Sequence, residues 1–263
     1  MPTVGSLFSG IGGLELGLER AGFEIKFQVE NDPFCQAVLA KHWPHVARHG
    51  DIRSFPLPDT ERVDLICGGF PCQPVSVAGK RRAQADERWL WPEFARVVRV
   101  LRPRLVLVEN VSGLLDGGVG HVLGDLAALG FDAEWDVLPA SAFGAPHRRE
   151  RVFLAAVAGG EPGLGGVFAH GDDGIPRDSQ WRAAQGVESG SGWKCWLNAA
   201  AAALDWAGSS TWFHRMDDGL PEGLDGYRIH ALGNAVVPQV AEWIGRRLMA
   251  FLTEPRAWRA EGP

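Results

Sequence analysis

The chain has little of what marks disulfide-stapled, zinc-binding or membrane-spanning proteins. Its 263 residues include only four cysteines, which are widely spaced and form no C-x-x-C pair. A disulfide framework or a zinc site is therefore not expected, and a reducing compartment is predicted. No apolar run approaches the length of a membrane span, and no basic segment with an apolar leader opens the sequence. We expect no metal, no membrane and no targeting segment.

An excess of basic residues is also lacking. Lysine and arginine number 26 against 32 acidic residues, so the formal net charge is −6. This balance argues mildly against a nucleic-acid partner, but binding depends on where basic side chains cluster rather than on their sum. Two local clusters are present, at 80–82 (KRR) and 147–151 (HRRER). Either cluster is suited to phosphate or to the polar edge of a base.

The first 157 residues alternate short β-branched runs with amphipathic stretches. This pattern is typical of repeated βα units and predicts an α/β fold with a mainly parallel sheet. Helical patterns begin near residues 14, 33, 89 and 119. The predicted strands cover 4–8, 26–30, 63–67, 105–109, 134–138 and 152–157.

Beyond residue 158 the strand and helix rhythm breaks. Glycines, acidic residues and five tryptophans dominate 159–218, and only 197–206 reads as a helix. Helical spacing of apolar residues returns at 239–252. We therefore predict a catalytic and cofactor-binding domain at 1–157, a small irregular domain at 158–218, and a return segment at 219–263 whose helix packs on the first domain. The tryptophans suit a small core better than base stacking.

One cysteine lies where chemistry is expected. Cys72 sits in the segment 68–74 (GGFPCQP), on a turn that follows the apolar run 63–67. Open α/β sheets place ligands at the carboxyl ends of their strands, so Cys72 is a candidate nucleophile. The alternative is a buried cysteine that acts as a small apolar residue.

A glycine-rich segment, 8–13 (FSGIGG), follows the first predicted strand, and Glu30 ends the next one. Glycines let a backbone approach a ligand closely, and an acid about 20 residues later can bind ribose hydroxyls. The G-x-G-G spacing lacks the further glycine of the dinucleotide fingerprint, so a pyrophosphate is not specifically indicated. Asp51 could accept a hydrogen bond from an adenine amino group, or it could cap a turn.

Two further polar groups stand at strand ends. Glu109 and Asn110 close the run 105–108, and Arg149 and Arg151 lead into the strand at 152–157. A carboxyl group near a thiol can act as an acid toward a ring nitrogen. Strand alternation would place Arg149 and Arg151 on one side. Taken singly, each is as readily explained by a surface salt bridge or a charged turn.

Together these motifs, in this order, resemble the cytosine-5 DNA methyltransferases of the prokaryotic or phage type. The resemblance covers residues 1–157 and 219–252, including a closing segment at 233–238 (GNAVVP). It implies a Rossmann-like class I methyltransferase fold, S-adenosylmethionine as cofactor, and a small target-recognition domain. The implied catalytic residues are Cys72, Glu109, Arg149 and Arg151. The implied cofactor-binding residues are Phe8, Ser9, Gly10, Gly12, Gly13, Glu30, Asn31, Asp51, Ile52, Gly69, Pro71, Asn234, Ala235 and Val236. The implied substrate-binding residues are Pro71, Gln73, Ser76, Lys80, Arg81, Arg82 and Asn110.

The resemblance also implies a reaction. The Cys72 thiolate would add to C6 of a cytosine flipped out of duplex DNA, which makes C5 nucleophilic toward the cofactor's methyl group. A cytoplasmic monomer is expected, with a separate restriction endonuclease as a candidate partner. His147 stands where many members have Gln, and the usual segment before the closing motif is not recognisable. A catalytically impaired DNA-binding relative and a methyltransferase acting on RNA stay open as alternatives, and a nicotinamide-dependent oxidoreductase is remote.

Overall fold

The computed structural model describes residues 1–57, 62–71, 89–145, 148–159, 161, 163–164, 166–168 and 231–253. The chain divides into two compact units. The first comprises Met1–Leu138, Glu150–Ala169 and Asn234–Pro263, and the second comprises Pro139–Arg149 and His170–Gly233. Most of the predicted small domain, including its helix at 197–206, lies outside the described residues, so the predicted domain boundaries stay a prediction.

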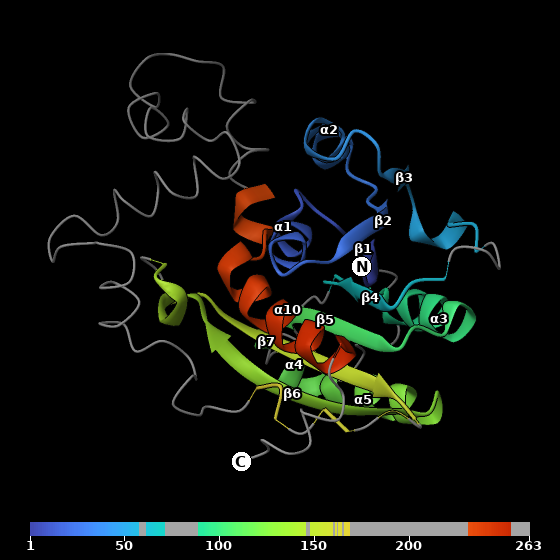
Figure 1. The fold of residues 1–263 in the computed structure, drawn as a ribbon, viewed down its shortest axis with the longest axis vertical. Coiled ribbons are helices and arrows are strands. Elements are labelled where there is room, and N and C mark those ends of the chain that lie inside the picture. The colour runs from blue at the N-terminus through green and yellow to red at the C-terminus, as the bar shows by residue number, and fades with distance from the viewer. Residues whose placement is uncertain are drawn as a thin grey trace, which may run out of the picture. The chain divides into compact units, whose positions relative to one another are not determined.

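A seven-stranded sheet organises the first unit (Figure 1). Its strands stand in the order β3-β2-β1-β4-β5-β7-β6. The pairs β3–β2, β2–β1, β1–β4 and β4–β5 are parallel, and β5–β7 is antiparallel. This mainly parallel, Rossmann-like arrangement confirms the predicted fold class. The strands are β1 (Thr3–Leu7), β2 (Glu24–Val29), β3 (Ala47–His49), β4 (Leu65–Gly68), β5 (Leu105–Val111), β6 (Phe131–Pro139) and β7 (Glu150–Ala158).

All six predicted strands are present, with shifted ends. The largest shift is at β6, which begins at Phe131 rather than at residue 134. The strand β3 was not predicted; it has only three residues, Ala47–His49, and no buried side chain. Such a strand carries no apolar alternation, and only its pairing with β2 defines it.

Helices cover both faces of the sheet. On one face α3 (Trp91–Leu101) and α5 (Val119–Ala128) share an apolar core with β1, β4, β5 and β7. This core includes Phe94, Val98 and Leu126 from the helices and Ile66 and Val106 from the sheet. The short helix α4 (Leu114–Gly117) precedes α5, and α2 (Pro33–His42) follows β2.

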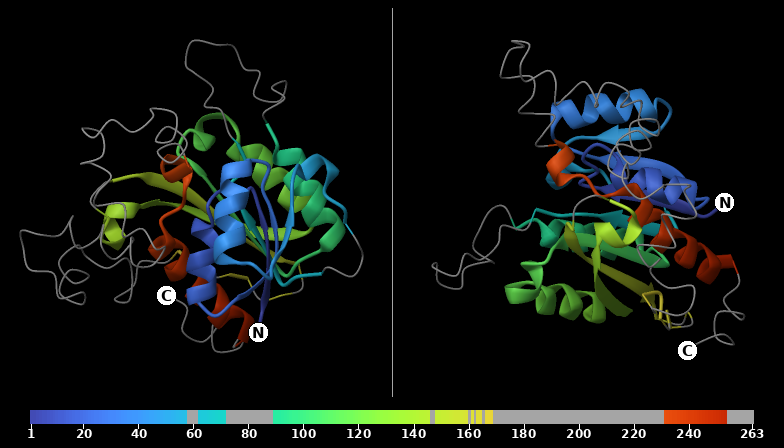
Figure 2. Two further views of the ribbon diagram at one scale, coloured as in Figure 1. Left: turned by 90° about the horizontal axis from the view of Figure 1, so that it is seen from above. Right: turned by 90° about the vertical axis from the view of Figure 1, so that its left-hand side faces the viewer.

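The other face carries α1 (Gly13–Arg20) and α10 (Pro238–Thr253), which lie side by side although they are far apart in the sequence (Figures 1 and 2). Glycines permit their close approach. A Cβ atom on Gly17 would lie 2.5 Å from the Cβ atom of Ala241, and one on Gly245 would lie 2.8 Å from that of Ala21. At the surface, Arg20 of α1 lies 3.9 Å from the carboxylate of Glu242 in α10.

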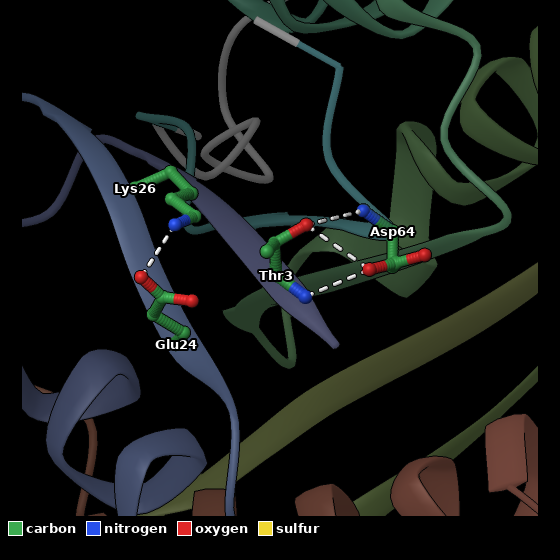
Figure 3. Close-up of polar contacts among 4 residues, drawn as sticks. All are labelled: Thr3, Glu24, Lys26 and Asp64. Carbon is green, nitrogen blue, oxygen red and sulfur yellow. Dashed lines mark hydrogen bonds and ion pairs between the residues drawn. The ribbon is translucent and has the colours of Figure 1, made fainter. Parts of the chain in front are cut away.

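Side-chain hydrogen bonds fasten β1 to the start of β4 at the amino end of the sheet. Asp64 Oδ2 accepts from the backbone nitrogen of Thr3 at 2.8 Å and from Thr3 Oγ1 at 3.0 Å (Figure 3). On β2, the Lys26 ammonium pairs with the carboxylate of Glu24 in the same view. The Thr3–Asp64 contact supports the β1–β4 register, which pairs Leu7 with Gly68 at the opposite end.

Candidate active site

The strand order reverses between β1 and β4, where the loops that follow the two strands leave the sheet together. In open α/β sheets this point is the expected position of a ligand. The backbones approach closely here, since a Cβ atom on Gly68 would lie 2.1 Å from the carbonyl oxygen of Leu7. Only glycine fits that position without displacing β1. The two segments that leave this point are the glycine-rich loop (residues 8–13) and the chain that leads to Cys72.

The glycine-rich loop uses backbone conformations that most residues avoid. Phe8 has φ 55°, Gly10 has φ 56° and Gly12 has φ 90°. For Phe8 this left-handed conformation carries strain, of a kind that clusters at functional sites. A Cβ atom on Gly12 would lie 2.4 Å from the ring of Trp43. Beside Gly10, by contrast, a Cβ atom would meet nothing within 4 Å among the described residues, so the backbone there faces open space.

The Glu30 carboxylate fastens this loop to the next one. Its Oε2 accepts from the backbone nitrogen of Gly10 at 2.7 Å, and its Oε1 accepts from that of Asp32 at 2.8 Å. Asp32 in turn caps α2 by accepting from the backbone nitrogen of Cys35 at 2.9 Å. Asn31 lies exposed between the two acids. Asp32 was not among the predicted site residues, although an acid directly before Pro33 is a helix-start signal.

Asp51 and Ile52 follow β3 at the same edge of the sheet. The Asp51 carboxylate accepts from the backbone nitrogen of Arg53 at 2.9 Å and so caps the short 3-10 helix η1 (Ile52–Ser54). Asp51 therefore caps a turn, which was one of its two predicted roles. Its side chain is about half exposed, and its contact with adenine stays a prediction. Ile52 is buried, and its carbonyl oxygen accepts from Arg96 Nη2 at 2.6 Å.

A mostly buried ion pair stands at the end of β5. Arg151 Nε lies 3.1 Å from Glu109 Oε1, and Glu109 is only 7% exposed. The pair forms because β7 runs antiparallel to β5, so the start of β7 lies beside the end of β5. The backbone of Gly69 packs closely against the same carboxylate, since a Cβ atom on Gly69 would lie 2.7 Å from Glu109 Oε2. The chain leading to Cys72 therefore passes directly against Glu109.

Asn110 holds the turn after β4. Its Nδ2 donates to the carbonyl oxygen of Phe70 at 3.0 Å, and its Oδ1 accepts from the backbone nitrogen of Val111 at 2.9 Å. The Phe70 ring packs edge-on against Trp89 at 5.2 Å between centroids. The Asn110 amide was predicted to bind substrate. It is buried and already used inside the protein, which suits a residue that positions the turn.

Of the remaining predicted residues, some are described by the structure and others are not. Asn234, Ala235 and Val236 precede α10. This segment lies against the start of α1, because a Cβ atom on Gly13 would lie 2.3 Å from the carbonyl oxygen of Val236. Pro71 is the last described residue of its turn and is exposed. Six predicted residues lie outside the described part of the chain: Cys72, Gln73, Ser76, Lys80, Arg81 and Arg82.

The expectation that Arg149 and Arg151 alternate along one strand was wrong. The strand β7 begins at Glu150, and Arg149 precedes it with φ 32°, which is not an extended conformation. Arg149 belongs to the second compact unit, whereas Arg151 belongs to the first. The pattern of alternation therefore cannot place Arg149 beside Glu109.

The two described cysteines are poor candidates for a nucleophile. Burial raises the pKa of Cys35 to about 12, with the nearby charges of Glu30 and Asp32 adding to the effect. Burial raises the pKa of Cys67 as well, with nearby Glu15 acting in the same direction. Within the described residues no group of three or more His, Cys, Asp or Glu side chains could hold a metal ion. No helix in that part of the chain is long and apolar enough to cross a membrane.

Comparison with known proteins places this arrangement in context. The family model described as "C-5 cytosine-specific DNA methylase" matches residues 3–168. The chain is 37% identical over 154 residues to the type II methyltransferase M.NgoMIV of Neisseria gonorrhoeae, a match that covers 57% of this chain and 49% of the relative. The chain thus spans about half the length of this relative.

Solved structures agree with the fold. One, described as a DNA modification methyltransferase encoded within an Escherichia coli prophage, is 30% identical with a TM-score of 0.50, over 60% of this chain and 47% of that one. The Entamoeba histolytica methyltransferase EhMeth is 15% identical with a TM-score of 0.61, over 97% of this chain and 99% of its own. The second likeness concerns the fold alone.

Proposed function

Because the chain belongs to the family of C-5 cytosine-specific DNA methylases, we propose that it methylates C5 of cytosine in duplex DNA with S-adenosylmethionine as cofactor. The observation that supports this most directly is the Glu109–Arg151 pair, packed against Gly69 three residues before Cys72. A carboxyl group, a guanidinium group and the backbone of a cysteine-bearing turn meet at the point where this sheet is expected to bind ligands.

The residues at the switch point fit S-adenosylmethionine. Each Glu30 oxygen accepts one backbone hydrogen bond and has lone-pair capacity left for a ribose hydroxyl. The backbone at Gly10 faces open space, which allows a ligand close approach. We assign the adenosyl group to the glycine-rich loop, Glu30, Asn31, Asp51 and Ile52, and the remainder to Gly69, Pro71 and the segment 234–236. When bound, this cofactor supplies an electrophilic methyl group on a sulfonium ion.

The proposed chemistry begins at Cys72. Its thiolate forms a bond to C6 of the cytosine ring, and the displaced electron pair makes C5 nucleophilic. Glu109 holds or protonates N3, which accepts the charge as C6 is attacked, and Arg151 orients the Glu109 carboxyl group. Arg149 is assigned to the ring carbonyl oxygen. C5 takes the methyl group as S-adenosylhomocysteine is released. A base, for which water is the candidate, then removes the C5 proton, the bond between C6 and sulfur breaks to release the Cys72 thiolate, and N3 gives back any proton it took from Glu109.

The substrate and partners follow from this chemistry. A cytosine inside a duplex is inaccessible to the thiol, so the base must be flipped out of the stack. We assign phosphate contacts to Lys80, Arg81 and Arg82, and substrate contacts to Gln73 and Ser76. Asn110 acts through the Phe70 turn. A cytoplasmic monomer, with a separate cognate endonuclease, completes the proposal.

A methyl-transfer assay on the whole chain tests the proposal. The protein is incubated with tritiated S-adenosylmethionine and mixed-sequence duplex DNA, with transfer RNA in a parallel reaction. We expect label in DNA that digests to 5-methylcytosine. Cys72→Ala should abolish transfer and keep S-adenosylhomocysteine binding by calorimetry, and Glu109→Gln should lower the rate about 100-fold or more.

Matched controls separate loss of chemistry from loss of fold. Glu24→Gln removes an exposed carboxylate that pairs with Lys26 at the amino end of β2, at the opposite edge of the sheet from the site, and should leave transfer unchanged. Retained methylation by Cys72→Ala would overturn the mechanism. Label found in transfer RNA but not in DNA would replace the proposed substrate. Cofactor binding without transfer to either would identify a catalytically impaired relative.

A further inference from the structure

A buried polar cluster that the proposed chemistry does not use lies beneath the glycine-rich loop. Glu15, Ser6 and Gln28 are fully buried, and Ser9 is 8% exposed. The sheet register pairs Ser6 with Gln28 on β2 and with Cys67 on β4. Paired residues of parallel neighbours project from the same face, so these three side chains form a row across the sheet. Glu15, in the first turn of α1, lies near Ser6 and Cys67 of this row.

The hydrogen bonding of this cluster is incomplete among the described residues. The Ser9 hydroxyl donates to Ser6 Oγ at 3.1 Å. Neither oxygen of Glu15 and neither amide atom of Gln28 makes a hydrogen bond in that part of the chain, although the Ser6 and Ser9 hydroxyls lie near enough to Glu15 to affect its ionisation. A buried polar group without a partner normally destabilises a fold, and a leucine here would avoid that penalty. An acid in this position therefore suggests a function.

The surroundings of Glu15 favour its neutral form. Burial raises the pKa of Glu15, and the nearby Glu30 carboxylate acts in the same direction. The Ser6 and Ser9 hydroxyls and a backbone amide oppose the shift only in part. The Cys67 thiol is an ionisable group beneath Glu15, and among the described residues no cation acts on this carboxyl group. A neutral carboxyl group has an O–H that it can donate.

The cluster and the cofactor loop are connected through two serines. Ser6 is in β1, Ser9 is in the loop, and the left-handed residue Phe8 stands between them. The backbone nitrogen of Ser9 donates to Val29 at 3.1 Å, and that of Gly10 donates to Glu30 at 2.7 Å. Any group that fixes the two hydroxyls therefore fixes the backbone that carries Phe8 and Gly10.

We propose that Glu15 is a positioning residue for the cofactor, whose neutral carboxyl group donates to the Ser6–Ser9 hydroxyl pair and holds the glycine-rich loop in its binding conformation. The inference rests on the proposed function, since it assigns the adenosyl group to this loop. Ionisation of Glu15 removes the donor and places a second negative charge near Glu30. Cofactor affinity is then highest below the pKa that Glu15 has in the folded protein, and it falls as the pH rises through that value.

Calorimetry with S-adenosylhomocysteine on the whole chain tests this from the ordinary glutamate pKa of about 4.3 up to the highest pH at which the protein stays folded. The variant Glu15→Gln keeps the shape and a hydrogen-bond donor but cannot ionise, and Glu15→Leu removes the donor. We expect Glu15→Gln to bind within about twofold of the natural protein at the lowest pH and to exceed it increasingly as the pH rises. Glu15→Leu should bind about 10-fold more weakly at the lowest pH, the loss of roughly one hydrogen bond.

The design isolates Glu15 from other titrations. The ligand's own amino group titrates identically in both experiments, so the affinity ratio of Glu15→Gln to the natural protein reports Glu15 alone. Glu24→Gln, which replaces an exposed carboxylate at the start of β2, should reproduce the natural pH profile. A natural protein that binds no S-adenosylhomocysteine would overturn the proposed function together with the inference. Binding by the natural protein with an affinity ratio that is constant in pH would overturn the inference alone, and this outcome stays available if Glu15→Leu does not fold.

Discussion

At the scale of single residues, the candidate site depends on the close contact between the backbone of Gly69 and the carboxylate of Glu109. Gly69 lies against the Glu109 carboxylate, and Arg151 holds that carboxylate from β7. Two contacts therefore constrain the Glu109 carboxylate. The backbone of Gly69 packs against it, and the guanidinium group of Arg151 pairs with it. Under the proposed function Glu109 meets one ring nitrogen, and such an acid requires constraint, since misplacement by about 1 Å can cost about 100-fold in rate.

The variant Gly69→Ala tests this constraint. The added Cβ atom would lie 2.7 Å from Glu109 Oε2, so the carboxylate must move or the turn must shift. We expect the rate of methyl transfer to fall about 100-fold while S-adenosylhomocysteine affinity changes less, as tritium transfer and calorimetry would measure. Gly120→Ala is the matched control, because its Cβ atom would meet nothing within 4 Å in the described residues and α5 would gain a better helix former. Equal rates for both variants would refute the assigned role of the Gly69 contact.

At the scale of elements, sequence patterns predicted the frame of the site better than its details. The apolar run 105–108 correctly predicted a strand, because strands buried on both faces of a sheet are continuously apolar. The strand β3 was missed because Ala47–His49 owes its conformation to pairing with β2 rather than to its own side chains. The burial of Glu15 was missed for a related reason: a glutamate in a first helical turn is ordinarily a solvated residue that favours the helix dipole, and only the packed tertiary structure buries it.

The contact between α1 and α10 leads to a prediction about stability. Gly17 approaches Ala241 and the carbonyl oxygen of Pro238 so closely that a Cβ atom would lie 2.5 Å from each. Gly17→Ala should therefore lower the free energy of unfolding by about 1–3 kcal/mol, because overpacking outweighs the gain in helix propensity. Chemical denaturation of the whole chain measures this difference. Gly124→Ala in α5 has open space around its Cβ atom and should be neutral or stabilising. A stabilising Gly17→Ala would show that the two helices are not in such close contact.

At the scale of the whole molecule, the family of the chain favours a DNA substrate, whereas its net negative charge does not favour binding to DNA phosphates. The family match covers residues 3–168, which contain the glycine-rich loop and the Glu109–Arg151 pair. The chain nevertheless spans about half the length of the relative from Neisseria gonorrhoeae, and it carries a net charge of −6. The DNA complex that we propose would therefore depend on a few local basic groups rather than on a generally positive surface. Its affinity should depend on salt only to the extent that those groups contact phosphates.

The segment 80–82 gives this expectation a measurable form. Each phosphate neutralised by a lysine or arginine contributes about 0.9 to the slope of log affinity against log salt concentration. Replacing Lys80, Arg81 and Arg82 together by alanine should reduce the magnitude of that slope by up to about 3 in fluorescence titrations of duplex DNA. A double control, Lys26→Ala with Arg246→Ala, removes two surface cations that pair with the carboxylates of Glu24 and Glu242. An unchanged slope in the triple variant would assign the phosphate contacts to other residues, whereas an equal reduction in the control would indicate a nonspecific effect of net charge.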